Sequence, residues 1–314
     1  MMDRRQFLAG ALAVVAAPHA LARRRPVALV TADLEARLVA VAVPGGEVVR
    51  HVPTHDYPRS IEAVGAVAVV GHPEIGVVSV VDARALRVVH VLRGFGEPRY
   101  TAGHPDGRHA FVTDAARGEV VAVDVVRGRV AGRVEVGARA RHIGIDPRGR
   151  TVWTALGSKA EEVAVVSVAD PARPRLLRRF RPPFLAHDVG FAPDGRRVWL
   201  SSGDRFELAV YDARAGRLLA RPSGDWPPQH VTFAGGLAYV TSGWSGTLYV
   251  HRLDGRVLRR AVVPVGSYNV QYGADCVVTP SLGHGDLTVL DRSGRVLRSE
   301  RIARSSHDSC VVWT

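Results

Sequence analysis

Four of the thirteen histidines follow one another at similar intervals or multiples of them, at His142, His187, His230 and His307. Imidazole nitrogens are good ligands for Zn, Cu, Fe and Ni, and three or four that converge can hold such an ion. Two of these histidines are followed by an aspartate, Asp188 and Asp308. We expect these carboxylates to accept the second ring N–H of a histidine or to act as ligands themselves. The pattern predicts a transition-metal site, with Cu, Zn or Fe as the candidate ions. The competing interpretation is that each histidine only hydrogen-bonds to neighbouring backbone and fills space.

The histidine spacing reflects a repeat. In residues 186–228 four short apolar runs are separated by turns, and Pro193-Asp194-Gly195 separates the first two. No run has the 3.6-residue period of a helix. Four strands in about forty residues is the period of a β-propeller blade. Aligned units place in one register, at intervals of 40, 42, 45, 43, 39 and 38 residues, the positions Ser60, Tyr100, His142, His187, His230, Asn269 and His307.

The two ends of the repeat array predict how the ring closes. Residues 27–31 align with a second strand, and residues 307–311 align with a first strand. We therefore expect the C-terminal strand to complete the N-terminal blade, which removes the exposed edges of an open array. Six complete blades and this shared one predict an all-β, seven-bladed β-propeller. It has four-stranded antiparallel blades and forms a single domain over residues 23–314.

The aligned positions should form a ring at one mouth of the central channel, because the first strand of each blade lines that channel. Asn269 and Tyr100 then join the histidines as candidate ligand-binding residues. Loops on the same face carry two further histidines, His72 and His284. Three basic residues precede ring positions and should create a positive field suited to a carboxylate or phosphate; they are Arg59, Arg99 and Arg141.

Several second strands share a motif of a small or β-branched residue, an aromatic residue, and Val or Thr. The examples are Ala110-Phe111-Val112-Thr113-Asp114, Ala238-Tyr239-Val240-Thr241-Ser242 and Val152-Trp153-Thr154-Ala155. They resemble the Tyr-Val-Thr-Asn repeat of YVTN-type propellers, a group that includes YncE-like and lactonase-type proteins. The resemblance covers the whole chain after the leader. It implies the propeller fold but not one activity, since members of the group include hydrolases, binding proteins and cofactor enzymes.

Composition limits the functional classes. The net charge is +12, and all but one of the 42 basic residues are arginine, spread through every repeat. Solvated strand faces and turns explain this distribution better than a nucleic-acid groove, which would need aromatic side chains among the basic ones. Nucleic acid is therefore the least favoured partner. No segment after residue 22 approaches the roughly 20 apolar residues of a membrane span. We expect a monomer.

The only two cysteines, Cys276 and Cys310, lie in the last blade and the closing strand. These elements are neighbours in a closed ring, so a disulfide and two buried thiols are both compatible with the sequence.

The N-terminus resembles a twin-arginine (Tat) signal peptide. Arg4 and Arg5 precede Phe7-Leu8, a moderately apolar run follows over residues 9–17, and Ala20-Leu21-Ala22 provides a cleavage site. We predict a signal peptide over residues 1–22 and export by the Tat route to the periplasm, cell envelope or exterior. That route carries folded proteins.

Two main functions are compatible with these features. One is an exported metal-binding protein or metal-dependent oxidoreductase or hydrolase that takes a small polar ligand at the channel mouth. The other is a non-catalytic module whose mouth and loops bind a protein or small-molecule ligand.

Overall fold

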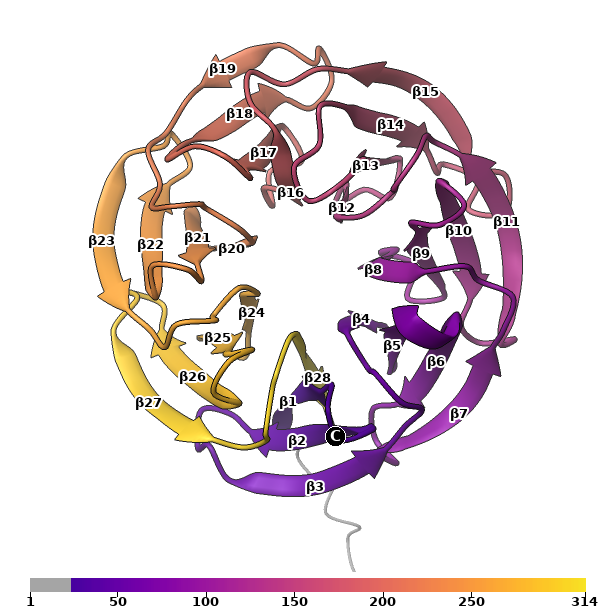
Figure 1. Ribbon diagram of the computed structural model, residues 1–314, viewed down its shortest axis with the longest axis vertical. Coiled ribbons are helices and arrows are strands. Elements are labelled where there is room, and N and C mark those ends of the chain that lie inside the picture. The colour runs from indigo at the N-terminus through magenta and orange to yellow at the C-terminus, as the bar shows by residue number, and fades with distance from the viewer. Residues whose placement is uncertain (1–23) are drawn as a thin grey trace, which may run out of the picture.

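Short runs rich in valine form strands because β-branched side chains suit a pleated, half-buried surface. The computed structural model describes residues 24–314, where 28 strands make seven four-stranded sheets arranged in a ring (Figure 1). The predicted signal peptide, residues 1–22, lies outside the described residues. In the described part no helix is long and apolar enough to cross a membrane.

The first four blades run from the centre outwards as follows. Blade 1 contains β28 (Ser309–Trp313), β1 (Pro26–Ala32), β2 (Arg37–Ala42) and β3 (Val48–Pro53). Blade 2 contains β4 (Ser60–Val64), β5 (Val67–His72), β6 (Val77–Asp82) and β7 (Arg87–Leu92), with the 3-10 helix η1 (Pro73–Ile75) before β6. Blade 3 contains β8 (Pro98–Gly103), β9 (His109–Asp114), β10 (Glu119–Asp124) and β11 (Arg129–Glu135). Blade 4 contains β12 (Ile143–Ile145), β13 (Thr151–Ala155), β14 (Val163–Ser167) and β15 (Arg175–Phe180).

The remaining three blades repeat this order. Blade 5 contains β16 (Ala186–Phe191), β17 (Arg197–Ser202), β18 (Leu208–Asp212) and β19 (Leu218–Ala220). Blade 6 contains β20 (Val231–Ala234), β21 (Leu237–Ser242), β22 (Thr247–Arg252) and β23 (Val257–Val262). Blade 7 contains β24 (Gln271–Gly273), β25 (Cys276–Pro280), β26 (Asp286–Asp291) and β27 (Val296–Arg301). The predicted seven-bladed fold is confirmed.

The closing strand is the one predicted. The C-terminal strand β28 pairs antiparallel with β1, with Leu29 opposite Cys310 and Val27 opposite Val312. The carbonyl oxygen of Asp308 accepts a further bond from the Thr31 amide at 2.9 Å. The first blade therefore combines the two ends of the described chain (Figure 1).

Apolar cores lie between neighbouring blades, and the outermost strands face solvent. Strand β27 is exposed along its whole length, whereas the inner strands of that blade are mostly buried. Arginines mark these outer strands, as in β15 and β23. Charged side chains on an edge strand prevent pairing with another chain. Part of the positive charge is thus explained by the outer strands of the ring.

The two cysteines are unbonded and buried. Cys310 packs in the core shared by blades 1 and 2, and Cys276 packs in the core shared by blades 7 and 1. Their side chains therefore lie on opposite faces of blade 1. Of the two alternatives compatible with the sequence, the structure has two buried thiols. Burial raises the pKa of Cys276 to about 11 and that of Cys310 well above its usual value.

Hydrogen bonds from second strands connect blades 3, 5 and 6 to the blade that follows each of them. The Thr113 hydroxyl donates to the carbonyl of Arg141 at 2.6 Å, and Ser201 donates in the same way to Gln229. Thr241 donates to Tyr268. Each acceptor directly precedes a channel-lining position of the following blade. The Thr or Ser of the repeated second-strand motif therefore positions the residues of the channel mouth.

Candidate metal centre at the channel mouth

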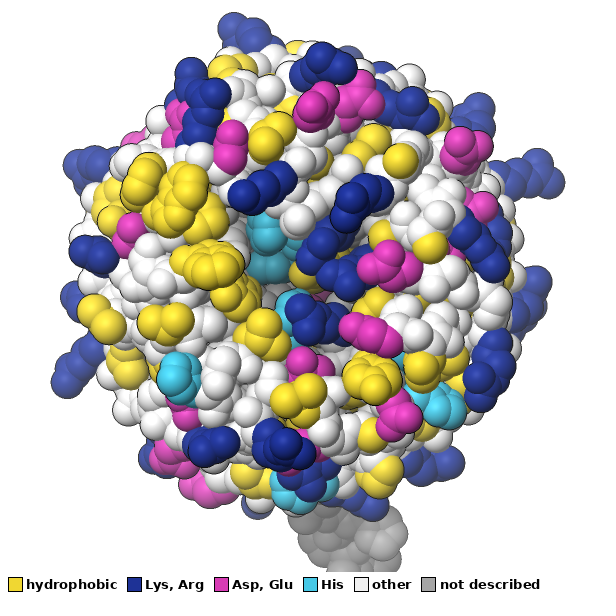
Figure 2. Space-filling view, viewed as in Figure 1, with side chains coloured by type: hydrophobic (Ala, Val, Ile, Leu, Met, Phe, Trp, Pro, Cys, Tyr) yellow, Lys and Arg dark blue, Asp and Glu magenta, His cyan; other side chains and the backbone are white. Residues whose placement is uncertain are grey.

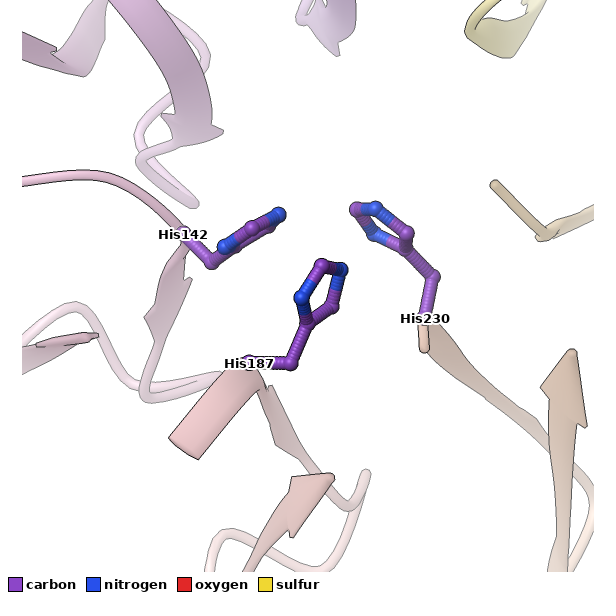
Figure 3. Close-up of side chains that lie close together, drawn as sticks. All are labelled: His142, His187 and His230. Atoms are coloured by element: carbon purple, nitrogen blue, oxygen red, sulfur yellow. The ribbon is translucent and has the colours of Figure 1, made fainter. Parts of the chain in front are cut away.

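Three histidines from consecutive blades converge on the channel axis. His142 directly precedes β12, His187 lies in β16 and His230 directly precedes β20. Their side chains point toward one another (Figure 3), and one ring nitrogen of each lies within 4.8 Å of the others. In the part of the chain that the structure describes, this is the one group of three potential metal ligands at such distances. We call it the histidine triad.

A backbone hydrogen bond fixes the orientation of His187. Its Nδ1 lies 2.9 Å from the carbonyl oxygen of Ser158, which can only accept, so Nδ1 carries the proton. Nε2 of His187 is then unprotonated and free to bind a metal. A second ring N–H that donates to a carbonyl is the usual partner of a metal-bound histidine.

His142 is the unusual member of the triad. It is fully buried, and neither ring nitrogen has a hydrogen-bond partner. Its ring packs at a tilt against Tyr100, at a centroid distance of 4.1 Å, and against His187, at 4.2 Å. Leaving a buried polar group without a partner costs about 1–3 kcal/mol. The pocket therefore holds His142 at a cost in stability that a bound ion would recover.

The environment keeps all three imidazoles neutral. Burial lowers the pKa of His187 to about 4 and that of His230 to about 3. Burial, and then the neighbouring His187 and His230, lower the pKa of His142 well below its usual value. A neutral imidazole is the form that binds metal ions.

His307 lies apart from the triad. Its ring centroid is 6.5 Å from that of Tyr100, and Tyr100 in turn contacts His142. Its Nδ1 donates to the carbonyl of Arg59 at 3.0 Å, so Nε2 is again unprotonated. The four aligned histidines thus form a group of three, and the fourth, His307, lies beside Tyr100.

Three arginines surround Tyr100 at the mouth. The Nε atoms of Arg59, Arg99 and Arg141 are buried and have no hydrogen-bond partner. Arg59 lies 3.5 Å from Asp33, and Arg99 lies 3.2 Å from Glu97. Figure 2 shows a central hollow with histidine at its base and basic side chains along one side. The suitability of this side of the mouth for an anionic group stays a prediction.

Asp188 and Asp308 join blades rather than binding the histidines that precede them. Asp188 Oδ2 accepts the amide of Val231 at 3.1 Å, and Asp308 Oδ2 accepts that of Ile61 at 3.4 Å. Each acceptor therefore bridges to the next blade at the same place. Asp188 Oδ2 also lies 3.6 Å from Nδ1 of His230. The ring N–H groups of His187 and His307, which we expected to meet carboxylates, meet carbonyl oxygens instead.

Below the triad the channel contains a cavity of about 230 Å³. Tyr100, His230 and Asn269 line its upper end, and Asp188, Asp308 and Glu62 line its wall. Burial raises the pKa of Glu62 to about 7, that of Asp188 to about 6 and that of Asp308 well above its usual value. Apolar residues further along the first strands, including Phe191 and Phe233, complete the lining.

Of the two histidines predicted to lie in loops, only His284 does, because His72 is the last residue of β5. His72 is buried, with Nδ1 2.9 Å from the carbonyl of Asp56 and Nε2 3.0 Å from the hydroxyl of Ser79. Both its nitrogens are therefore occupied. His284 is exposed in the loop between β25 and β26. Neither belongs to the triad.

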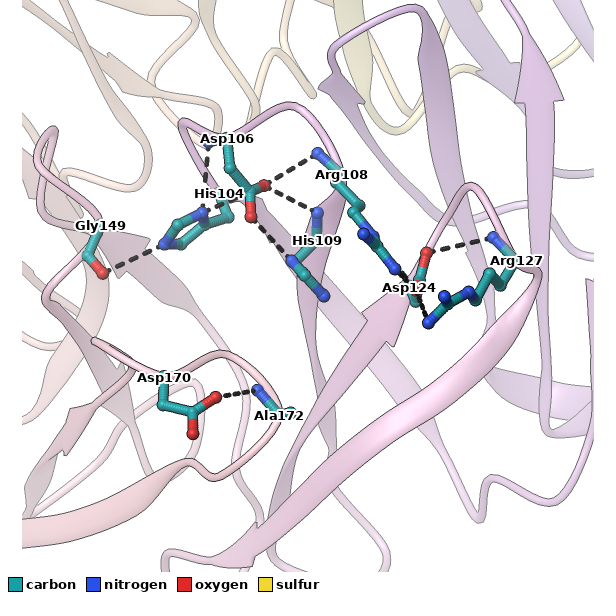
Figure 4. A network of polar contacts seen from close by, with 9 residues as sticks. All are labelled: His104, Asp106, Arg108, His109, Asp124, Arg127, Gly149, Asp170 and Ala172. Atoms are coloured by element: carbon teal, nitrogen blue, oxygen red, sulfur yellow. Dashed lines mark hydrogen bonds and ion pairs between the residues drawn. The ribbon is translucent and has the colours of Figure 1, made fainter.

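A second histidine network lies at the opposite end of the blade 3 strands (Figure 4). His109 donates to Asp106 at 2.7 Å, and His104 Nε2 lies 3.1 Å from the carbonyl of Gly149. Arg108 is paired with Asp124 at 2.7 Å. We call this group the rim network.

The cavity and its acid wall were missed by the sequence analysis. Glu62 and Thr101 carry the polar atoms that were overlooked, two and one residues beyond aligned positions. A signal was present, because an acidic residue occurs one or two places after the aligned position in blades 1, 2 and 5.

Comparisons with known proteins support the fold. No family model and no curated protein matches the chain, so the YVTN resemblance stays a prediction. Among solved structures, a protein of unknown function from Desulfotomaculum acetoxidans DSM 771 is similar over 91% of this chain and 98% of its own, with a TM-score of 0.79 and 13% identity.

Two further solved structures are similar. Hydrazine synthase of Kuenenia stuttgartiensis matches over 82% of this chain and 95% of its own, with a TM-score of 0.66 and 16% identity. Dihydro-heme d1 dehydrogenase NirN in complex with DHE matches over 88% of this chain and 64% of its own, with a TM-score of 0.64 and 17% identity. At these identities the likeness is one of architecture: the chain is a seven-bladed β-propeller with structural neighbours among enzymes.

Proposed function

We propose that the chain is a metal-dependent protein whose histidine triad holds a transition-metal ion at the channel mouth. The observation that carries the proposal is His142, a fully buried imidazole with both nitrogens unpartnered between two other candidate ligands. A residue with only a structural role would be expected to use at least one of these nitrogens, as His72 uses both.

The donor set fits such an ion. Three neutral imidazoles favour Zn, Cu, Fe or Ni over Mg or Ca, which prefer oxygen ligands. Ligand nitrogens in a tetrahedral site with Zn–N bonds near 2.0–2.1 Å lie about 3.3 Å apart. The triad nitrogens lie within 4.8 Å of one another, so small side-chain rotations would complete the coordination.

Three protein ligands and one open position are typical of catalytic rather than structural metal sites. A bound ion would polarise a substrate oxygen or lower the pKa of a bound water. The chain's own residues would orient the substrate. Arg141 and Arg99 can pair with a carboxylate or phosphate at the mouth, while Tyr100 can donate a hydrogen bond beside the triad. An oxidoreductase or a hydrolase acting on a small anionic substrate fits this arrangement best.

The first test is elemental analysis of the purified protein. We expect one equivalent of a transition metal per chain, and less than a tenth of this in His187→Ala/His230→Ala. His104→Ala/His109→Ala, in the rim network, is the matched control and should keep its metal. Full metal content in the triad variant would contradict the proposal, as would a metal-free wild type that cannot be loaded with Zn²⁺ or Cu²⁺.

An absorption spectrum of the same sample tests a competing ligand. The structural neighbour NirN was solved in complex with DHE. A tetrapyrrole iron takes one or two axial ligands from the protein, whereas this chain offers three convergent nitrogens. We therefore expect no Soret band. A Soret band that is lost in His307→Ala but kept in the triad variant would show that the ligand is a tetrapyrrole and not a bare metal ion.

We also propose that the protein works outside the cytoplasm, on the basis of the N-terminal sequence. Fractionation of cells should find the wild type in the exported fraction. Arg4→Lys/Arg5→Lys should accumulate inside. Export of both forms at equal rates would exclude the Tat route.

A non-catalytic binding module is the second candidate, favoured by exposed aromatic side chains. Phe206 and Trp226 are 60% and 42% exposed and have ring centroids 5.1 Å apart, and Trp244 is 68% exposed. They lie on loops that enter first strands or join second to third strands, on the same face as the triad. This function would be favoured if the metal-loaded protein turned over no substrate and if Phe206→Ala/Trp226→Ala no longer captured a ligand.

A further inference from the structure

The cavity beneath the triad has a polar wall rich in acceptors, and the Gln271 amide donates to one of them, Glu62 Oε2, at 3.3 Å. Three carboxyls line it, from Glu62, Asp188 and Asp308. Asp188 and Asp308 are 7% and 3% exposed, and Glu62 is partly buried. Among the described residues no Lys or Arg forms an ion pair with any of the three. Carboxyls removed from water are normally paired with a positive group.

Two neutral oxygens of the same cavity also have no partner. Asn269 is 4% exposed and its Oδ1 accepts no hydrogen bond, and Thr101 is 8% exposed with an unpartnered Oγ1. Both residues line the cavity. They are independent of the acid cluster, and each has an acceptor oxygen for which the described residues provide no donor.

Size and geometry decide what kind of donor fits. A cavity of about 230 Å³ has room for about eight water-sized groups, since each takes roughly 30 Å³. A bare ion would leave most of it empty. In the described part of the chain, the triad is the one group of three His, Cys, Asp or Glu ligand atoms within 4.8 Å of one another. The three carboxyls are therefore too far apart to coordinate one ion directly.

Much of the remaining lining is apolar. Ile61, Ile143, Ile145, Phe191 and Phe233 face the cavity beside the polar groups. Such walls suit methylene groups, whose burial contributes about 0.8 kcal/mol each. The cavity thus combines a cation-attracting wall with surfaces for a short carbon chain.

We infer that this cavity, which we call the acid pocket, binds a small organic cation with one or two ammonium groups and no more than about eight non-hydrogen atoms. The ammonium donates to the carboxyls and to the oxygens of Asn269 and Thr101. The carbon chain lies against the apolar wall. The acid pocket is a second site, distinct from the anion-binding arginines at the mouth, and it does not require the metal to be bound.

Isothermal titration calorimetry with 1,4-diaminobutane tests the inference, with n-butylammonium as a cation that has one ammonium group and 1-pentanol as a neutral probe. We expect one diamine per chain, weaker binding of the monoamine and none of the alcohol. Glu62→Gln, which keeps the shape of the side chain, should weaken binding at least tenfold. Glu135→Gln, an exposed acid in β11, is the matched control and should leave binding unchanged.

Further measurements distinguish this inference from the metal proposal and from binding of an inorganic cation in the acid pocket. His187→Ala lies outside the pocket lining, so it should lose metal and still bind the diamine. Thr101→Val removes an unpartnered oxygen without changing size and should weaken binding severalfold, even if Glu62→Gln does not fold. The inference is overturned by absence of diamine binding, by equal binding of 1-pentanol, by equal affinity in Glu62→Gln, or by Ca²⁺ binding in its place.

Discussion

The molecule contains two groups of histidines, the triad and the rim network, that differ in burial and in hydrogen bonding. In the rim network, His104 and His109 lie near an acid or a carbonyl that satisfies them (Figure 4). In the triad, His142 has no partner, and burial keeps the rings neutral. The rim group fastens a turn and a neighbouring blade. A histidine that is buried and unsatisfied, rather than one that is merely clustered, marks a site.

The largest difference between the two groups should be in metal-dependent stability. An ion at a thousand times its Kd stabilises the folded state by about 4 kcal/mol. Added Zn²⁺ or Cu²⁺ should raise the unfolding midpoint of the wild type and of His104→Ala/His109→Ala. It should not raise that of His187→Ala/His230→Ala. Differential scanning calorimetry with and without a chelator measures the shift, and equal shifts in both double variants would remove the distinction.

The next difference concerns the carboxylates beside each group. Asp308→Ala leaves the amides of Ile61 and Ser309 without their acceptor inside the channel wall, which should cost about 3 kcal/mol. Asp106→Ala exposes its donors to water at a turn and should cost about 1 kcal/mol. Urea unfolding measures both. Asp308→Asn retains an acceptor oxygen and should cost less than Asp308→Ala; the reverse order would show that charge, not bridging, is the role of Asp308.

The smallest difference is in how the free energy of unfolding depends on pH. Its sign at Glu62 in the cavity is opposite to its sign at Asp124 in the rim network. The pKa of Glu62 is raised to about 7, chiefly by burial, so its ionisation opposes folding. Stability should fall as pH rises from about 4.5 to 7, by roughly 2 kcal/mol, a value reduced because the side chain keeps some solvent contact. Glu62→Gln should lack this fall.

At the rim, the hydrogen bond from Arg108 lowers the pKa of Asp124 to about 2. Its stabilising effect is present above about pH 4 and should be lost as pH falls toward 2. Melting temperatures between pH 2 and 8 for the wild type, Glu62→Gln and Asp124→Asn provide the check. A Glu62→Gln profile parallel to that of the wild type between pH 5 and 7 would contradict the assignment.

The fold was predictable because it depends on a repeat that occurs seven times in the sequence. Seven blades could be predicted from the runs of valine and from turns such as Pro193-Asp194-Gly195. The closing strand could be predicted because the array begins with a second strand and ends with a first strand. The triad was predictable for the same reason, because equivalent positions in neighbouring blades must approach the same axis.

What depends on side-chain direction was not predictable. The repeat places His307 in register with the triad, yet His307 is not among the histidines whose ring nitrogens lie within 4.8 Å of one another. It places Asp188 after His187, yet the carboxylate reaches the next blade. The acid pocket combines residues from different places in the repeat, and no single alignment column contains it.

The pairing of β28 with β1 also has a kinetic consequence. Thr31 and Asp308 are 277 residues apart in sequence, whereas most strand pairs of each blade are close neighbours along the chain. Contacts between remote segments are slow to form. Blades 4, 5 and 6 can therefore bring the triad together early, while the wall that contains Asp308 is completed only when the ring closes. In refolding from denaturant, metal binding should return before amine binding, and the interval between them measures the time that the ring spends open.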